Sequence, residues 1–294
     1  METLHNQNVI LSAPREIVKD SLAQVLEKLN SECMANSEKV RFVILTSSQS
    51  RKPSDFTEES LKMFADSKKI VKKSVKDGFK LNICKVPKGT KTAEWISTLN
   101  NIFTSAYGLL EQGSEIFNST LNEIYTEADA FKNPENSKNI SLKEIYNKLV
   151  KKAEMSSGDD KERLKRLADR LFFFTLEELK ESICFGEASD DDIDSMCETD
   201  TVTLIELEES NTETVDIINQ YAMLALFKSA KNNPDTKEKT ILVLNDADRY
   251  IRKNDYLKPF FDMASGFGLY YVFTTDNFKF FPDFVIANTH QILQ

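Results

Sequence analysis

Two short polar stretches of the sequence contain residue types that bind and hydrolyse nucleotide phosphates in other proteins. The first, Ser12–Ser21, follows an apolar run and leads into a helical pattern. A phosphate-binding loop at such a place needs glycines whose N–H groups close on the phosphates, then a lysine and a hydroxyl residue that holds Mg²⁺. This stretch contains no glycine. Lys19 and Ser21 are therefore its nucleotide-binding candidates only in a shifted register, and the alternative is that Lys19 is an ordinary exposed helix residue.

The second polar stretch follows the apolar run Ile241–Leu244 and begins with Asn245 and Asp246. In a working nucleotide hydrolase of this layout, such a strand delivers an aspartate to Mg²⁺ and then a glutamate that activates water. Asn245 offers a neutral amide, which is a poorer ligand for Mg²⁺, and the Asp246 side chain is one methylene shorter than the expected base. We therefore expect no catalytic residue here and treat Asn245 and Asp246 as degenerate positions.

The elements around these stretches predict an α/β fold. Continuous apolar runs are typical of strands that are covered on both faces, as in a parallel sheet. The predicted strands are Val9–Leu11, Arg41–Leu45, Phe79–Ile83, Val202–Leu207, Thr240–Leu244, Leu269–Thr274 and His290–Leu293. Helical stripes separate them at 15–29, 214–230 and 257–264. Because strands occur at both ends of the chain, we expect one mainly parallel sheet flanked by helices.

The middle of the chain has a helical pattern from Ala93 to about Cys184. We expect a single domain over 1–294, made of a first core part (1–95), a helical insertion with an acidic loop (96–199) and a second core part (200–294). The acidic stretch 186–200 predicts an exposed loop. The alternative, an acidic metal site, lacks the glycine-centred 12-residue register of a Ca²⁺ loop.

Three stretches in the second core part carry a family resemblance: Asn245–Tyr250, Gly266–Asn277 and Ile286–Gln294. They resemble, in order, the phrases DEAHRF, GLGLILATQRPSDLP and SNA-T-ILR of the HerA/FtsK branch of the P-loop ATPases. Ile102–Leu110 and the stripes that follow it are similar to the helical insertion of that family. The resemblance covers most of the chain and implies a three-layer RecA/HerA-like P-loop NTPase core with a mainly parallel sheet and a helical insertion. A generic three-layer α/β protein is the alternative.

The departures from that family pattern concern its functional positions. Besides the phosphate loop, Asn245 and Asp246, the sensor glutamine is replaced by Asp276 and the closing arginine by Gln294. An acidic turn expected after the second strand is replaced by Thr46–Ser50. Because transition-state charge stabilisation is the main catalytic contribution in phosphoryl transfer, we expect a pseudo-ATPase that binds no cofactor. The alternative is a divergent ATP-dependent DNA translocase or nucleotide-binding motor that uses Lys19, Asp246 and Asp248 with ATP and Mg²⁺.

Composition limits the other classes of function. Only two histidines are present and the four cysteines are widely spaced, so a histidine triad, a zinc ribbon and a disulfide framework are not indicated. The apolar runs are far shorter than the roughly 20 residues that span a bilayer. The first residues lack the pattern of a signal peptide. We therefore expect a cytoplasmic protein with reduced thiols.

Partners follow from charge and from the resemblance. A net charge of -9 does not indicate a dominant grip on nucleic acid. Two basic segments remain DNA-binding candidates, although such runs are usually solvated faces. They contain Lys72, Lys73 and Lys76, at helical spacing, and Lys165 and Arg166. The resemblance implies a ring-type assembly with itself or with an active HerA-like ATPase, in which this chain is a structural or regulatory subunit.

Overall fold

The computed structural model of the chain describes residues 3–13, 15–46, 61, 64, 68–74, 80–175, 184–185, 192–194, 198–207, 212–232, 238–251 and 255–293. The chain divides into two compact units. The sheet unit consists of residues 1–74, 194–215 and 229–294, and the helical unit consists of residues 75–193 and 216–228. The prediction of one domain over 1–294 stays a prediction.

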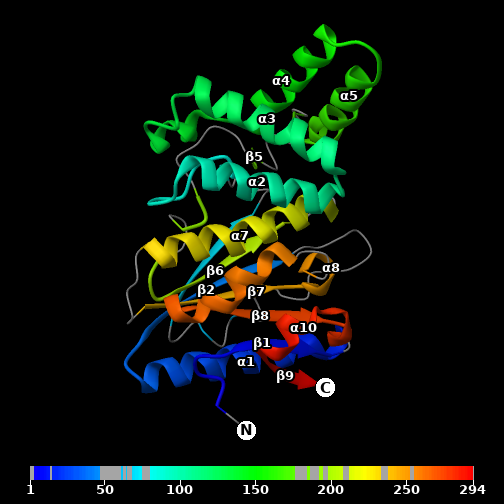
Figure 1. The fold of residues 1–294 in the computed structure, drawn as a ribbon. Coiled ribbons are helices and arrows are strands. Elements are labelled where there is room, and N and C mark those ends of the chain that lie inside the picture. The colour runs from blue at the N-terminus through cyan, green and yellow to red at the C-terminus, as the bar shows by residue number, and fades with distance from the viewer. Residues whose placement is uncertain are drawn as a thin grey trace. The chain divides into compact units, whose positions relative to one another are not determined.

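The sheet unit is built on seven strands in the order β3-β6-β2-β7-β8-β1-β9, and neighbouring strands all run parallel (Figure 1). Their bounds are β1 Asn8–Ser12, β2 Lys39–Thr46, β3 Lys69–Ser74, β6 Thr201–Glu206, β7 Glu238–Leu244, β8 Leu269–Thr275 and β9 Thr289–Leu293. The predicted parallel sheet is thereby confirmed. Its central strands are continuously apolar because both faces of the sheet are covered.

Helices cover the two faces of this sheet. Leu22, Leu26 and Leu29 of α1 (Arg15–Ala35) lie in one core with alternate residues of the strands, among them Val9 and Val272. Side chains of the intervening residues point to the other face. There the rings of Tyr271 and Phe273 stack on Phe261 of α9 (Lys258–Ala264), with centroids 5.1 and 5.6 Å apart. The connection from β1 through α1 to β2 crosses the sheet in the opposite direction to the connection from β7 through α9 to β8. Because such crossovers between parallel strands are right-handed, the two helices lie on opposite faces of the sheet.

Short elements complete the second half of the sheet unit. They are α8 (Asp248–Ile251), η5 (Asp255–Leu257), η6 (Ser265–Phe267), η7 (Phe278–Phe280) and α10 (Asp283–Ala287). Helix α7 (Thr212–Asn232) contributes its ends to the sheet unit and its middle to the helical unit. Within the described residues, no helix combines the length and the apolar character needed to cross a bilayer.

The helical unit confirms the predicted helical pattern as far as Thr175. Its elements are β4 (Lys80–Leu81), α2 (Thr92–Tyr107), α3 (Glu111–Glu127), η3 (Pro134–Asn139), α4 (Leu142–Met155), α5 (Gly158–Phe172), η4 (Phe173–Thr175) and β5 (Cys184–Phe185). Ser141 begins α4 with a capping box, since its hydroxyl accepts the Glu144 N–H and the Glu144 carboxylate accepts the Ser141 N–H. Of the predicted strand Phe79–Ile83, residues 80–83 are described, and within them Lys80–Leu81 forms β4, which pairs with β5.

One predicted element is wrong. The lysines of the first basic segment were expected at helical spacing, but Lys69–Ser74 forms the edge strand β3, parallel to β6. Ile70 packs against the hydrophobic core of the sheet unit, and this apolar contact outweighs the helical spacing of the lysines. Lysines are common on edge strands because they discourage pairing with another chain. In the predicted acidic loop, 192–194 and 198–200 are described, and Asp200 adopts a positive φ of 61°.

Candidate functional site at the carboxyl edge of the sheet

The carboxyl ends of β1, β8 and β7 lie side by side, because β8 stands between the other two strands. Ser12 at the end of β1 is in register with Thr275 at the end of β8, and the Ala13 N–H donates to the Thr275 carbonyl at 3.3 Å. Ligands of open parallel sheets bind outside the carboxyl ends of the strands. The structure therefore brings Ser12, Asn245 and Asp276 to one edge of the sheet.

The connection from β1 to α1 is short. Strand β1 ends at Ser12 and α1 begins at Arg15, so two residues separate them. A phosphate loop of the G-x-x-x-x-G-K-[ST] type wraps the phosphates with about six residues before its lysine. Lys19 lies inside α1, and its side chain is outside the described residues. Ser21 is buried within α1, at 5% exposure.

Two side chains that follow β7 are hydrogen-bonded to threonines of β8. Asn245 is buried, and its Oδ1 accepts a hydrogen bond from the Thr274 hydroxyl at 3.2 Å. The Asp248 carboxylate accepts one from the Thr275 hydroxyl at 2.7 Å. An amide oxygen that is buried and already hydrogen-bonded is a poor ligand for an incoming Mg²⁺, since binding would leave the threonine unpaired.

The backbone after β7 turns sharply at Asp246. This residue has a φ of 49°, in the left-handed region that aspartate adopts more readily than most residues. Its carbonyl accepts the Arg249 N–H at 3.2 Å, and the Ala247 N–H donates to the Thr274 carbonyl at 3.3 Å. These bonds fix the strand-to-helix turn between β7 and α8.

Asp276 follows β8 directly and is exposed. The next residue, Asn277, donates its N–H to the Thr275 hydroxyl at 3.1 Å. Asp276 therefore lies at the same edge as Asn245, whereas Gln294 falls outside the described residues. Thr274 and Thr275 were not among the site residues predicted from the sequence. Their signal was available, because two hydroxyl residues end an otherwise apolar strand.

The described candidate DNA-binding residues lie on β3 of the sheet unit and on α5 of the helical unit. On β3, the Lys72 ammonium lies 3.1 Å from the carboxylate of Glu206, and Lys69 lies 3.0 Å from Glu198. Lys68 also contacts Asp200, so acidic neighbours offset much of this segment's charge. Lys73 is half-buried and Lys76 is outside the described residues. The other two candidates, Lys165 and Arg166, are exposed on α5 in the helical unit. DNA binding stays a prediction for both segments.

Comparison with known proteins places the fold. No family model matches the chain, and no curated protein matches it. Among solved structures, VirB4 of Thermoanaerobacter pseudethanolicus superposes with a TM-score of 0.64 at 17% sequence identity, over 96% of this chain and 73% of that one. The chain has the fold of VirB4. The predicted fold class is therefore confirmed.

The bacterial conjugative coupling protein TrwB shares this fold at lower similarity. TrwB in complex with a non-hydrolysable ATP analogue superposes with a TM-score of 0.57 at 12% identity, over 92% of this chain. TrwB with ADP and Mg²⁺ gives a TM-score of 0.53 at 13% identity. The chain spans 63% of each of these TrwB chains. At such identities the likeness concerns the fold alone.

Proposed function

We propose that this chain is a catalytically inactive HerA-like ATPase homologue that acts in the cytoplasm as a structural or regulatory subunit of an oligomeric assembly. The observation that carries the proposal is the carboxyl edge of the sheet. A nucleotide hydrolase needs a glycine-rich loop at the end of β1, whereas this chain has a two-residue connection between β1 and α1. It also needs a carboxylate that can bind Mg²⁺ at the end of β7, whereas this chain has Asn245, whose amide oxygen is hydrogen-bonded to Thr274.

Phosphoryl transfer depends on positioning and on charge stabilisation, so the altered positions act together. The short connection supplies few N–H groups to phosphates, and Pro14 removes a further donor. Asn245 supplies no negative charge to Mg²⁺. Asp246 follows in a left-handed turn that fixes its backbone. Loss of several of these contributions supports an inactive site more strongly than any single substitution does.

The second candidate function is a divergent nucleotide-binding motor. It is favoured by the fold, since TrwB has been solved with an ATP analogue and with ADP and Mg²⁺. In such a motor, Lys19, Asp246 and Asp248 would have to act in place of the missing groups. The two functions differ in whether Mg·ATP stabilises the native chain.

Urea unfolding with and without millimolar Mg·ATP separates them. Ligand that binds only the native state adds RT ln(1 + [L]/Kd), about 2.7 kcal/mol at a concentration 100 times the Kd. We expect no shift of the urea midpoint and no ATP hydrolysis above background. The double variant Asn245→Asp, Asp246→Glu should likewise show no hydrolysis. Hydrolysis that is lost in Asp246→Ala but kept in Asp159→Ala, a matched control exposed on α5, would favour the motor instead.

The subunit role is tested by the state of assembly. A copy that has lost its own nucleotide site can still offer a packing face to itself or to an active HerA-like partner. We expect light scattering coupled to size exclusion to give a mass well above the 33.6 kDa of one chain, alone or with such a partner. A mass of one chain under every condition would contradict the assembly role while leaving the inactive site intact.

A further inference from the structure

A second cluster of reactive side chains lies at the opposite edge of the sheet, where β2, β7 and β8 begin. His5 comes from the N-terminal segment, Cys33 from the last turn of α1, and Glu38 from the residue before β2. One ligand atom from each of these residues lies within 4.8 Å of the other two. The proposed pseudo-ATPase function uses none of them.

The end of α1 brings Cys33 and Glu38 together. Ser37 adopts a φ of 58° and donates its N–H to the Met34 carbonyl at 2.9 Å. The Glu38 N–H donates to the Cys33 carbonyl at 3.0 Å. This pair of bonds is a Schellman motif, which ends a helix by folding the next residue back over its last turn. The backbone of Glu38 is therefore fixed beside that of Cys33.

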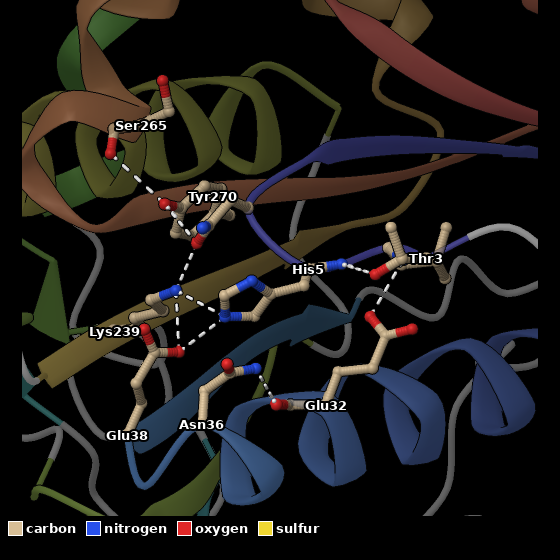
Figure 2. Close-up of polar contacts among 10 residues, drawn as sticks. Thr3, His5, Glu32, Asn36, Glu38, Lys239, Ser265 and Tyr270 are labelled. Carbon is tan, nitrogen blue, oxygen red and sulfur yellow. Dashed lines mark hydrogen bonds and ion pairs between the residues drawn. The ribbon is translucent and has the colours of Figure 1, made fainter.

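The N-terminal segment brings His5 to the same place. Leu4 is buried in the core, and its N–H donates to the Glu32 carboxylate on α1 at 2.9 Å. The Gln7 N–H closes a turn on the Leu4 carbonyl at 3.2 Å. Between these two anchors, His5 turns its Nε2 toward Glu38 Oε2 at 2.8 Å, as Figure 2 shows.

The donor set is one that zinc prefers. Imidazole nitrogen, thiolate sulfur and carboxylate oxygen bind Zn²⁺ at about 2.0–2.3 Å, so tetrahedral ligands stand about 3.5 Å apart. The His5 Nε2 and Glu38 Oε2 atoms, 2.8 Å apart, would separate by less than 1 Å, and the other ligand atoms, all within 4.8 Å, need to approach by at most about 1 Å. Thiolate and imidazole also select against Mg²⁺ and Ca²⁺, which take oxygen ligands.

A cation already contacts two of these donors, Glu38 and His5. The ammonium of Lys239, at the start of β7, lies 2.8 Å from Glu38 Oε2 and 3.0 Å from His5 Nε2, and it also donates to Asn6 Oδ1 (Figure 2). The Lys239 side chain is only 7% exposed and lies 5.5 Å from the centre of the Tyr270 ring. The surroundings thus stabilise positive charge at this position.

We propose that His5, Cys33 and Glu38 form a binding site for a transition metal of the zinc class, which enters by displacing the Lys239 ammonium into solvent. A water molecule would take the fourth position. Burial raises the pKa of the Cys33 thiol to about 11, so the thiol keeps its proton before the metal binds. On binding, the S–H bond breaks, the sulfur–metal bond forms and the proton leaves to solvent. One divalent ion with a thiolate and a carboxylate makes a neutral site.

Titration of the full-length reduced chain with Co²⁺, and competition by Zn²⁺, test this proposal. We expect one Co²⁺ per chain and a thiolate-to-cobalt charge-transfer band that Zn²⁺ abolishes. Cys33→Ser should remove the band, and His5→Gln should weaken affinity by more than the roughly 10- to 100-fold that outer-shell substitutions cost. Lys239→Met should bind more tightly, because the competing ammonium is gone.

The chain offers matched controls for both ligand types. Cys84 is a second buried free thiol, and His290 is the second histidine. Cys84→Ser and His290→Gln should bind Co²⁺ as the native chain does, and circular dichroism establishes that each variant is folded. Absence of a band in the native chain overturns the proposal, even if Lys239→Met shows one. A band that survives Cys33→Ser overturns it equally.

Discussion

Two residues with positive φ flank the central strands β7 and β8: one follows the end of β7 and the other precedes the start of β8. Asp246 leaves the carboxyl end of β7 with a φ of 49°, and Gly268 enters β8 with a φ of 73°. The Gly268 carbonyl accepts the Thr240 N–H at 2.9 Å, which ties the start of β8 to β7. A Cβ atom at Gly268 would stand 2.9 Å from the Glu238 carbonyl oxygen, so space and torsion angle both select glycine here.

Gly268→Ala should therefore destabilise the chain by about 2 kcal/mol, from the left-handed backbone and the contact with a rigid strand carbonyl. Gly266→Ala is the matched control. It lies two residues earlier, without a positive φ, and its added Cβ meets no atom within 4 Å, so we expect a change within about 0.5 kcal/mol. Urea unfolding measures both. Equal effects of the two substitutions would contradict the view that the positive φ and the close carbonyl of Glu238 require glycine at position 268.

At the scale of elements, α3 and α4 are joined by charged side chains. The Glu123 carboxylate on α3 lies 2.6 Å from the Lys152 ammonium and 3.7 Å from that of Lys148, both on α4. Lys148 also contacts Glu127. Burial alone would raise the pKa of Glu123, but hydrogen bonding to Lys152 and the nearby lysine charges outweigh it and lower the pKa.

This depressed pKa gives a pH dependence with a definite sign. A carboxylate whose pKa is lower in the folded state stabilises above its unfolded pKa, about 4.3, and the stabilisation is lost as pH falls through the folded value. Since the Glu123 side chain is 41% exposed, solvent screening limits the effect of Glu123→Gln to about 0.5 kcal/mol at pH 7. The urea midpoints of variant and native chain should differ most above about pH 5 and approach each other as the pH falls below about 4.3. Glu115→Gln, exposed on the same helix, should show no such pH-dependent difference.

Elements were predictable from sequence where one periodicity dominated. Helices α2 to α5 follow apolar stripes, and β2, β7 and β8 follow continuous apolar runs, so their positions were expected. Strand β3 was not, because the lysines around Ile70 imitate helical spacing and only pairing with β6 decides the conformation. The residues next to β3 in the sequence cannot predict its pairing with β6, which lies more than 100 residues downstream.

At the scale of the whole molecule, one of the two clusters could be predicted and the other could not. Asn245 and Asp276 follow predicted strands, and parallel strands bring their carboxyl ends to one edge. His5, Cys33 and Glu38 meet through a loop, a helix end and a turn, none of which has a period. The hydroxyls of Thr274 and Thr275 needed the strand register before they could be paired with Asn245 and Asp248.

The helical unit is discontinuous in sequence, because residues 216–228 of α7 belong to it together with 75–193. Trp95 on α2 is fully buried, and its ring meets that of Tyr221 on α7 edge-on at 5.9 Å. The Lys228 ammonium on α7 pairs with Glu94 on α2, and its side chain is only 3% exposed. Packing of α2 thus depends on a segment that lies far downstream.

A fragment of residues 75–193 should therefore not fold cooperatively. Without α7, the surface around Trp95 stays open to water, and the lost aromatic pair and ion pair are not replaced. We expect helical circular dichroism but a broad urea transition, with Trp95 emission at the wavelength of the unfolded chain. Trp95 is the one tryptophan of the sequence, so the emission reports the surroundings of this side chain. A fragment of residues 75–232, which restores α7, should shift the emission to the blue and sharpen the transition. Cooperative unfolding of 75–193 with emission like that of the full chain would show that α2 needs no downstream partner.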